Sequence, residues 1–272
     1  MTKTRDSAGF DPGTPNEARV VDYLLGGKDN FAADREAADR AIAVAPELPM
    51  MAHESRRFLG RAVRFLVAEG VRQFIDIGCG LPTQSNAHEV AQAVAPDSRV
   101  VYVASDPVVV THSRAILADE VRTSVIQADL RDPDRVLAHP DLLRLIDVKR
   151  PVAILLISAL HSIPEDEAAL DIVARLRRAI TSGSWMVISH PISDSSPQVT
   201  ERLATLFQDR QIVKGSRRRD NVRSRAEVEP YFDGLELAEP GIARLPAWRR
   251  GRDEPAIDPE SFWAVAGVGR KP

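Results

Sequence analysis

The feature that most constrains this chain is the alternation of short apolar segments with longer amphipathic segments between residues 73 and 190. Short runs rich in Val and Ile are typical of strands buried on both faces, and the amphipathic segments between them are typical of helices. Strands that alternate with helices form a mostly parallel sheet with helices on both faces. The sequence therefore predicts an α/β fold with five strands, at residues 73–77, 99–105, 123–127, 152–157 and 185–190.

A helical region precedes the first strand. Asn16 is expected to cap a first helix, the Gly26-Gly27 pair to end it, and Asp29 to cap a second helix. A third helix is expected after two prolines. We therefore predict two parts, an N-terminal tail with a helical cap over residues 1–70 and a sheet-containing core over residues 71–272.

The later segments predict further helices and a hairpin. Ser162 and Glu165 have the spacing of a capping box, in which the two side chains bond to each other's backbone at a helix start. Two apolar segments, at 235–237 and 262–267, predict an antiparallel hairpin at the edge of the sheet. Helical patterns occupy residues 85–95, 108–117, 133–137, 141–145, 164–179 and 197–211.

The first predicted strand ends in a glycine-containing turn, Asp76-Ile77-Gly78-Cys79-Gly80. Glycines between a strand and a helix let the backbone approach a ligand closely, although the same pattern also serves as a plain tight turn. A dinucleotide site usually has a third glycine, and Gln84-Ser85 occupies that region here, which disfavours NAD. Asp76 just before the glycines suits a ligand that carries a cation.

The composition excludes several classes of protein. A formal net charge of -3 gives no overall attraction to nucleic acid or anionic lipid. Cys79 is the only cysteine, which rules out an intramolecular disulfide, argues against a thiolate zinc site and fits a reducing cytoplasm. The first residues contain no apolar run, and the longest run, 152–160, is too short for a bilayer. We therefore expect a cytoplasmic protein with no membrane anchor and no metal.

Four segments together resemble the successive motifs of class I S-adenosylmethionine-dependent methyltransferases, which have a Rossmann-like sheet. They are Asp76 to Gly80, Val103 to Pro107, Gln127 to Leu130 and Ala159 to His161. More narrowly, five further segments resemble an actinobacterial family of S-adenosyl methyltransferases long classed as a domain of unknown function. These are Pro15 to Arg19, Tyr23 to Asn30, Gly80 to Thr83, Phe232 to Glu236 and Gly267 to Lys271. The resemblance covers nearly the whole chain and implies S-adenosylmethionine as cofactor.

The resemblance also implies roles for individual residues. Gly78 and Gly80 are expected beneath the methionine part of the cofactor, and Asp129 with the Leu130 amide at its adenine edge. Asp129 has a plainer alternative, because it also fits a loop that leads into a helix starting at Pro133.

One position departs from the general class. Ala104 stands where an acidic residue usually binds the ribose hydroxyls, and Asp106 follows two residues later. Asp106 is therefore our candidate for ribose binding. It is an equally good N-cap for the helix that follows Pro107.

The sequence is less specific about the residues that contact the methyl acceptor. His161 lies just past the fourth strand, where it is a general base, a substrate contact or a structural histidine. The polar break between the first two helices is either a lid over the site or a simple helix-helix turn. Its candidate lid residues are Tyr23, Gly26, Gly27, Lys28 and Asn30.

The sequence does not identify the methyl acceptor. The basic run from Lys214 to Arg225 contains Asp220 and no aromatic residue, which favours a solvated loop over a nucleic-acid surface. We expect direct transfer of a methyl group to a small-molecule acceptor rather than to nucleic acid. The alternative is a non-catalytic S-adenosylmethionine-binding protein that acts as a sensor or partner subunit.

Overall fold

The computed structural model describes residues 11–82, 85–117, 121–208 and 222–272. In these residues one sheet has the strand order β3-β2-β1-β4-β5-β8-β6, and β7 also pairs with β8. Strands β1 to β5 are parallel, and β8 is antiparallel to its neighbours. The strands are β1 Gln73–Ile77, β2 Arg99–Ala104, β3 Thr123–Gln127, β4 Ala153–Ile157, β5 Trp185–Pro191, β6 Glu236–Leu237, β7 Ala243–Arg244 and β8 Ala264–Arg270. The predicted α/β fold is confirmed.

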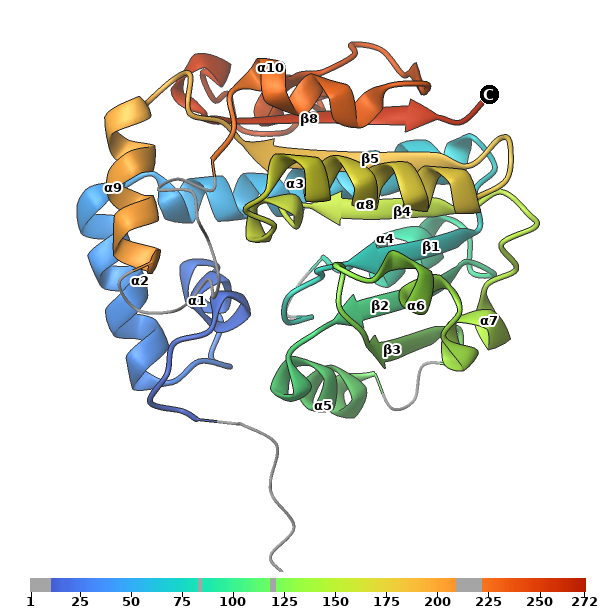
Figure 1. Cartoon of the computed structure of the whole chain (residues 1–272), viewed down its shortest axis with the longest axis horizontal. Helices are drawn as coiled ribbons and strands as arrows, with labels where there is room; N and C mark the ends of the chain where they lie inside the picture. The colour runs from blue at the N-terminus through green and yellow to red at the C-terminus, as the bar shows by residue number, and fades with distance from the viewer. Residues whose placement is uncertain (1–10, 83–84, 118–120, 209–221) are drawn as a thin grey trace, which may run out of the picture.

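Helices cover both faces of this sheet (Figure 1). They are α1 Glu17–Leu24, α2 Ala32–Val44, α3 Leu48–Ala68, α4 Ala87–Val94, α5 Pro107–Ile116, α6 Pro133–Leu137, α7 Pro140–Leu145, α8 Asp166–Ala179, α9 Pro197–Gln208 and α10 Arg225–Val228. Short 3-10 turns lie at η1 Leu160–Ser162, η2 Glu229–Phe232, η3 Leu245–Ala247 and η4 Pro259–Ser261.

Alternating residues of each strand face opposite helical layers. Phe74 belongs to the cluster that buries α3, α4 and α5, whereas Ile75 and Ile77 belong to the cluster beneath α6, α7 and α8. Phe65 of α3 packs edge-on against Trp185 of β5, with ring centroids 5.4 Å apart. Helix α3 therefore shares the hydrophobic core of the sheet, although it precedes the first strand.

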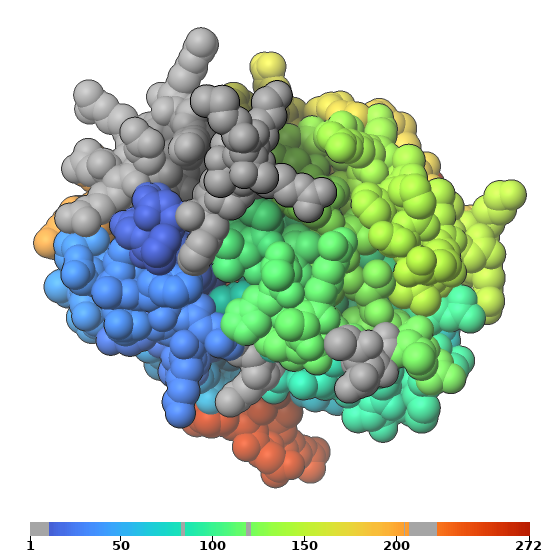
Figure 2. Space-filling model, turned by 90° about the horizontal axis from the view of Figure 1, so that it is seen from below, coloured from blue at the N-terminus to red at the C-terminus, as the bar shows by residue number. Residues whose placement is uncertain are grey.

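The carboxyl ends of the parallel strands point toward the side where α1, α2 and α9 lie (Figure 1). Helix α2 contacts both α1 and α9. Seen from below, the blue residues of the first helices border the green surface of α5 (Figure 2). The first two helices therefore cap the edge at which ligands of open α/β sheets bind.

Three predicted helix starts were wrong. The third helix was expected after Pro46 and Pro49, but α3 begins at Leu48, and Pro49 lies in its first turn. Helix α2 begins at Ala32 instead of after Asp29, because Asp34 accepts a hydrogen bond from the Phe31 N–H at 2.8 Å. The capping box predicted from Ser162 and Glu165 does not form. Ser162 is part of the turn η1, and its hydroxyl donates to the carbonyl of Ala159 at 2.8 Å.

The predicted C-terminal hairpin is present with one addition. Strands β6 and β8 pair antiparallel, but β8 lies between β5 and β6, and β7 from the connecting segment also joins it. The predicted helix at 197–211 corresponds to α9, and its last three predicted positions lie outside the described residues. None of the helices in the described ranges is long and apolar enough to cross a membrane.

Candidate functional site

The turn after β1 requires its glycines. Gly78 and Gly80 have φ angles of 79° and 66°, in the left-handed region that favours glycine. A Cβ on Gly78 would also lie 2.9 Å from the Cβ of Ala159, which is too close for two carbon atoms that are not bonded to each other. The Gly78 N–H donates to the carbonyl of Val103 at 2.9 Å, which ties the turn to β2. The predicted turn is therefore present at the carboxyl edge of the sheet.

Asp76 is a buried carboxylate directly before this turn. Asp76 is 3% exposed, and no group in the described part of the chain donates a hydrogen bond to its side chain. Burial raises the pKa of Asp76 to about 7, and the nearby Arg56 guanidinium opposes that increase. Asp76 is therefore an acceptor whose ionised form has no hydrogen-bonding partner of its own among the described residues, which favours a cationic ligand.

Arg56 of α3 lies at the same turn. Its guanidinium donates to the carbonyl of Leu81 at 3.1 Å and would lie 3.9 Å from a Cβ on Gly80. It also borders a cavity of about 470 Å³. The other residues around that cavity are Leu25, Gly27, His53, Arg57, Gly60, Arg64, Ser85, Val90, Asp253, Glu254 and Pro255. A carboxylate and a guanidinium thus stand together beside the glycine turn.

Asp106 is the N-cap of α5. One carboxylate oxygen accepts from the N–H groups of Val108 and Val109, at 2.7 and 3.2 Å. The other accepts from the side-chain amide of Asn16 at 2.6 Å. The capping interpretation is therefore confirmed, while ribose binding by Asp106 stays a prediction. Strand β2 ends at Ala104, which is buried.

Asp129 lies in a loop after β3, and its side chain is 46% exposed. It accepts from the backbone N–H of Arg131 at 2.9 Å and forms an ion pair with the same residue at 3.2 Å. Asp132 caps α6, with Pro133 at its first position, as the loop interpretation predicts. Leu130 is buried. The Asp129 carboxylate is exposed at the carboxyl edge of the sheet, and its binding of adenine together with the Leu130 amide stays a prediction.

His161 contacts the N-terminal cap. Its Nε2 lies 2.5 Å from the Glu17 carboxylate, 144 residues away in the sequence. Burial lowers the pKa of His161, but the charge and hydrogen bond of Glu17 outweigh it, so the pKa is raised above its ordinary value. For Glu17 burial acts in the opposite direction, and the His161 contact likewise outweighs it and lowers the pKa. Sequence analysis missed Glu17, because no local pattern links it to His161.

Arg223 fixes the turn that carries His161. Its side chain is 1% exposed and donates to the carbonyls of Leu160 and Ile163, at 3.3 and 2.8 Å. It also pairs with Asp166 at 2.8 Å and lies 3.2 Å from Nε2 of His190. The expectation of a solvated loop is therefore wrong for Arg223, since the chain returns here to clamp η1.

The rest of the basic run divides into two parts. Lys214 and Arg217 to Arg219 lie outside the described residues. Arg225 is exposed in α10 and pairs with Glu229 at 3.2 Å. In the described part of the run, both arginines thus serve the protein's own structure.

The predicted lid segment is a helix-helix turn built around Asp22. One oxygen of this buried carboxylate accepts from the Asp29 N–H and from the Asn30 side chain, both at 2.8 Å. Asp29 itself pairs with His112 of α5 at 3.5 Å. The turn interpretation is confirmed, with Asp22 instead of Asp29 as its organising side chain.

The other candidate lid residues lie around this turn. Tyr23 donates to Asp39 at 3.1 Å, and Lys28 is exposed. Gly26 has a φ of 77°, which ends α1. A contact of these residues with a ligand stays a prediction.

A second buried carboxylate, Asp34, holds the start of α1. It accepts from the backbone of Asn16, from the Arg19 side chain and from the Phe31 N–H, each at 2.8 Å. Sequence analysis did not single out Asp22 or Asp34. The signal that would have found them is a charged residue on the apolar face of an amphipathic helix, which needs a buried partner.

Replacing Gly27 by Ala is expected to destabilise the cap by about 2 kcal/mol or more. The new Cβ would lie 2.1 Å from an oxygen of Asp22, so that this carboxylate must give up its hydrogen bonds. Gly26→Ala is the matched control, because that Cβ meets nothing within 4 Å and only the positive φ costs energy. Hydrogen exchange of the α1 and α2 amides measures the difference, and equal protection in the two variants would contradict it.

This strand order, with a glycine turn after β1 and an antiparallel strand near the edge, defines a class I methyltransferase fold. A predicted methyltransferase of Thermobifida fusca is 42% identical, with 98% of each chain covered and a TM-score of 0.88. A DUF574 family protein of Streptomyces avermitilis is 40% identical, with 96% of this chain and 99% of that one covered and a TM-score of 0.88.

The chain belongs to the S-adenosyl methyltransferase family, whose sequence profile matches residues 3–272. A search of curated protein sequences found no match. The family's cofactor is S-adenosylmethionine.

The residues at the glycine turn fit that cofactor. Its methionine end carries an ammonium and a carboxylate, and Asp76 and Arg56 offer one group of opposite charge to each, while Gly78 and Gly80 leave the backbone open. When bound, the cofactor supplies an activated methyl group on a positively charged sulfur. In the described ranges, no cluster of His, Cys, Asp or Glu residues is arranged to hold a metal ion.

Proposed function

We propose that this protein transfers the methyl group of S-adenosylmethionine to an oxygen or nitrogen of a small-molecule acceptor. The family and the fold support methyl transfer, and the arrangement of the cap supports a small acceptor. We also propose a cytoplasmic location, because the one cysteine, Cys79, is free.

The observation that carries the proposal is the attachment of α1 to the carboxyl edge of the sheet. Asn16 bonds to Asp106 after β2, and Glu17 bonds to His161 after β4. Both contacts come from the start of one helix, so α1 lies across the edge where the cofactor and the acceptor of this fold meet. A covered edge limits access for a large polymer and keeps water from the reacting groups.

Positioning supplies most of the expected acceleration. A methyl group moves between two atoms only when donor and acceptor lie in line, and a rigid site provides that alignment. The glycine turn and the buried Asp76 position the methyl donor, while the capped edge of the sheet positions the acceptor.

A non-catalytic S-adenosylmethionine-binding protein is the second candidate. Ala104 stands in place of the usual ribose-binding acid, and both oxygens of Asp106 already accept hydrogen bonds from the protein. A weakened ribose contact is compatible with a sensor or a partner subunit, which needs to bind the cofactor but not to use it.

Calorimetric titration with S-adenosylmethionine and S-adenosylhomocysteine tests the proposal, with NAD as the control ligand. We expect binding of both adenosyl ligands and none of NAD, and affinity about tenfold lower in Asp129→Ala, equivalent to one lost hydrogen bond. Incubation with methyl-labelled cofactor and the small-molecule fraction of an actinobacterial extract then tests transfer. Binding without any transfer would favour the second candidate, and absence of binding in folded protein would contradict both.

A further inference from the structure

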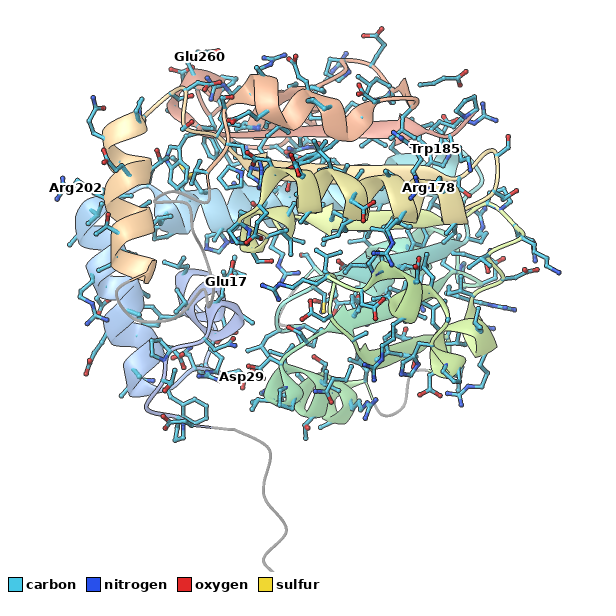
Figure 3. The ribbon with its side chains drawn as sticks, in the orientation of Figure 1. Glu17, Asp29, Arg178, Trp185, Arg202 and Glu260 are labelled. Atoms are coloured by element: carbon cyan, nitrogen blue, oxygen red, sulfur yellow. The ribbon has the colours of Figure 1, made fainter. Side chains whose placement is uncertain are left out.

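A short contact between α1 and the carboxyl edge of the sheet joins two groups that exchange protons readily. Glu17 lies on the side of α1 that faces the sheet (Figure 3), and its Oε1 is 2.5 Å from Nε2 of His161. Proton-transfer groups of this kind at the carboxyl end of a central strand are suited to general base catalysis. A helix-stabilising role alone would not require a histidine as the partner.

We propose that Glu17 and His161 act as one proton-accepting pair for the methyl acceptor, so that the site is complete only when α1 is seated on the sheet. This inference rests on the proposed methyltransferase function. It assigns a catalytic role to a residue of the N-terminal cap, in addition to the residues at the glycine turn and the strand ends.

The geometry shows which atom of the pair faces the acceptor. Nδ1 of His161 is buried and faces the backbone of Ser158, so it is closed to an incoming molecule. The Glu17 side chain is 43% exposed, and its second oxygen, Oε2, makes no hydrogen bond within the described ranges. The Glu17 carboxylate therefore meets the acceptor, and His161 orients it and shares the proton.

The surroundings of the pair determine its charge. Arg223 opposes a positive charge on His161, and His190 behind it is buried, with a pKa that burial lowers to about 3, so it is neutral. Asp166 balances Arg223 at 2.8 Å. When the imidazole is neutral and Glu17 is ionised, the pair can accept one proton. Because Glu17 raises the pKa of His161, this proton-accepting form is reached at a higher pH than for an isolated histidine.

The proposed step balances without another reactant. The bond between the methyl carbon and sulfur breaks, and a bond between the methyl carbon and the acceptor oxygen or nitrogen forms. The proton of that oxygen or nitrogen passes to the pair, and the positively charged sulfur becomes a neutral thioether. The pair then returns its proton to water before the next turnover.

Two measurements on Glu17→Gln test the pair, with Glu36→Gln as the matched control, since Glu36 is an exposed carboxylate of the same cap. The first is the titration of His161 followed by NMR of its ring Cε1–H, assigned through His161→Gln. The second is transfer of labelled methyl from S-adenosylmethionine to the small-molecule extract as a function of pH. Thermal unfolding and calorimetric binding of S-adenosylhomocysteine accompany each variant.

Glu17→Gln is expected to lower the pKa of His161 by about one unit or more and to reduce methyl transfer about 100-fold, while cofactor affinity and unfolding temperature stay near those of wild type. Glu36→Gln is expected to change neither quantity. Wild-type transfer by Glu17→Gln, or an unchanged His161 titration, would overturn the pair and leave the methyltransferase proposal standing. A wild-type protein that binds the cofactor but transfers no label would overturn both proposals.

Discussion

Replacing Arg223 by Ala is expected to destabilise the folded protein by about 3–5 kcal/mol, the typical cost of removing one partner from a buried charged network. The guanidinium is 1% exposed, and its loss removes the side-chain donor from the carbonyls of Leu160 and Ile163. The turn η1 then loses its clamp. Urea unfolding at neutral pH measures the change in the free energy of unfolding.

Arg225→Ala is the matched control for that measurement. Arg225 and its partner Glu229 have side chains that are 47% and 52% exposed, and exposed ion pairs contribute about 0–1 kcal/mol. Similar losses in the two variants would show that the network around Arg223 is hydrated in solution and that η1 does not depend on it.

Asp76→Asn is expected to weaken the binding of S-adenosylmethionine about 100- to 1,000-fold, because the cation of the ligand would lose a desolvated carboxylate, a loss of about 3–4 kcal/mol. Calorimetry measures the affinity, and Asp97→Asn is the control, since that carboxylate is 72% exposed. An unchanged affinity in Asp76→Asn would mean that the cation binds elsewhere.

The same variant is expected to remove a dependence of binding on pH. The carboxyl of Asp76 has a pKa of about 7 in the folded protein, and a bound cation favours its ionised form. Wild-type affinity is therefore expected to fall as the pH drops below 7, by up to about tenfold per unit, because the ligand must first displace a proton. Titrations on both sides of that pH test this, and a flat wild-type profile would contradict it.

Stability without the ligand is expected to change in the opposite direction. The folded pKa of Asp76 lies above its ordinary value of 3.8, so the protonated group favours the folded state at low pH and this contribution is lost as the pH rises through 7. Above that pH, Asp76→Asn is expected to be more stable than wild type by about 1–3 kcal/mol, since an uncharged amide replaces a buried charge. The buried carboxylate is thus retained for binding at a cost in stability.

Much of the fold was predictable because its signals are local. The strands β1 and β3 begin and end where the sequence predicts, since their short apolar pairs, Phe74-Ile75 and Val125-Ile126, are rich in residues that favour strands. Asn16 caps α1 and Asp106 caps α5, as their side chains and the helices that follow indicate. Such features depend on residues within one turn of each other, so the pattern alone reveals them.

The helix starts that failed show the limit of the same reasoning. Asp29 and Ser162 are good capping residues by type, yet each side chain contacts another group instead of capping a helix. Asp29 turns to His112 of another helix, and Ser162 is drawn into the tight turn after β4. A propensity of about 1 kcal/mol is easily overridden by such contacts.

The sequence by itself determined the α/β fold, the glycine turn and the buried carboxylate before it, because these follow from periodicity and from short-range sterics. Only the tertiary structure decided that Glu17 meets His161 and that Arg223 clamps η1. These partners are separated by 144 and 63 residues. Their contacts depend on how the cap and the late C-terminal segments pack against one edge of the sheet, and no local pattern carries that information.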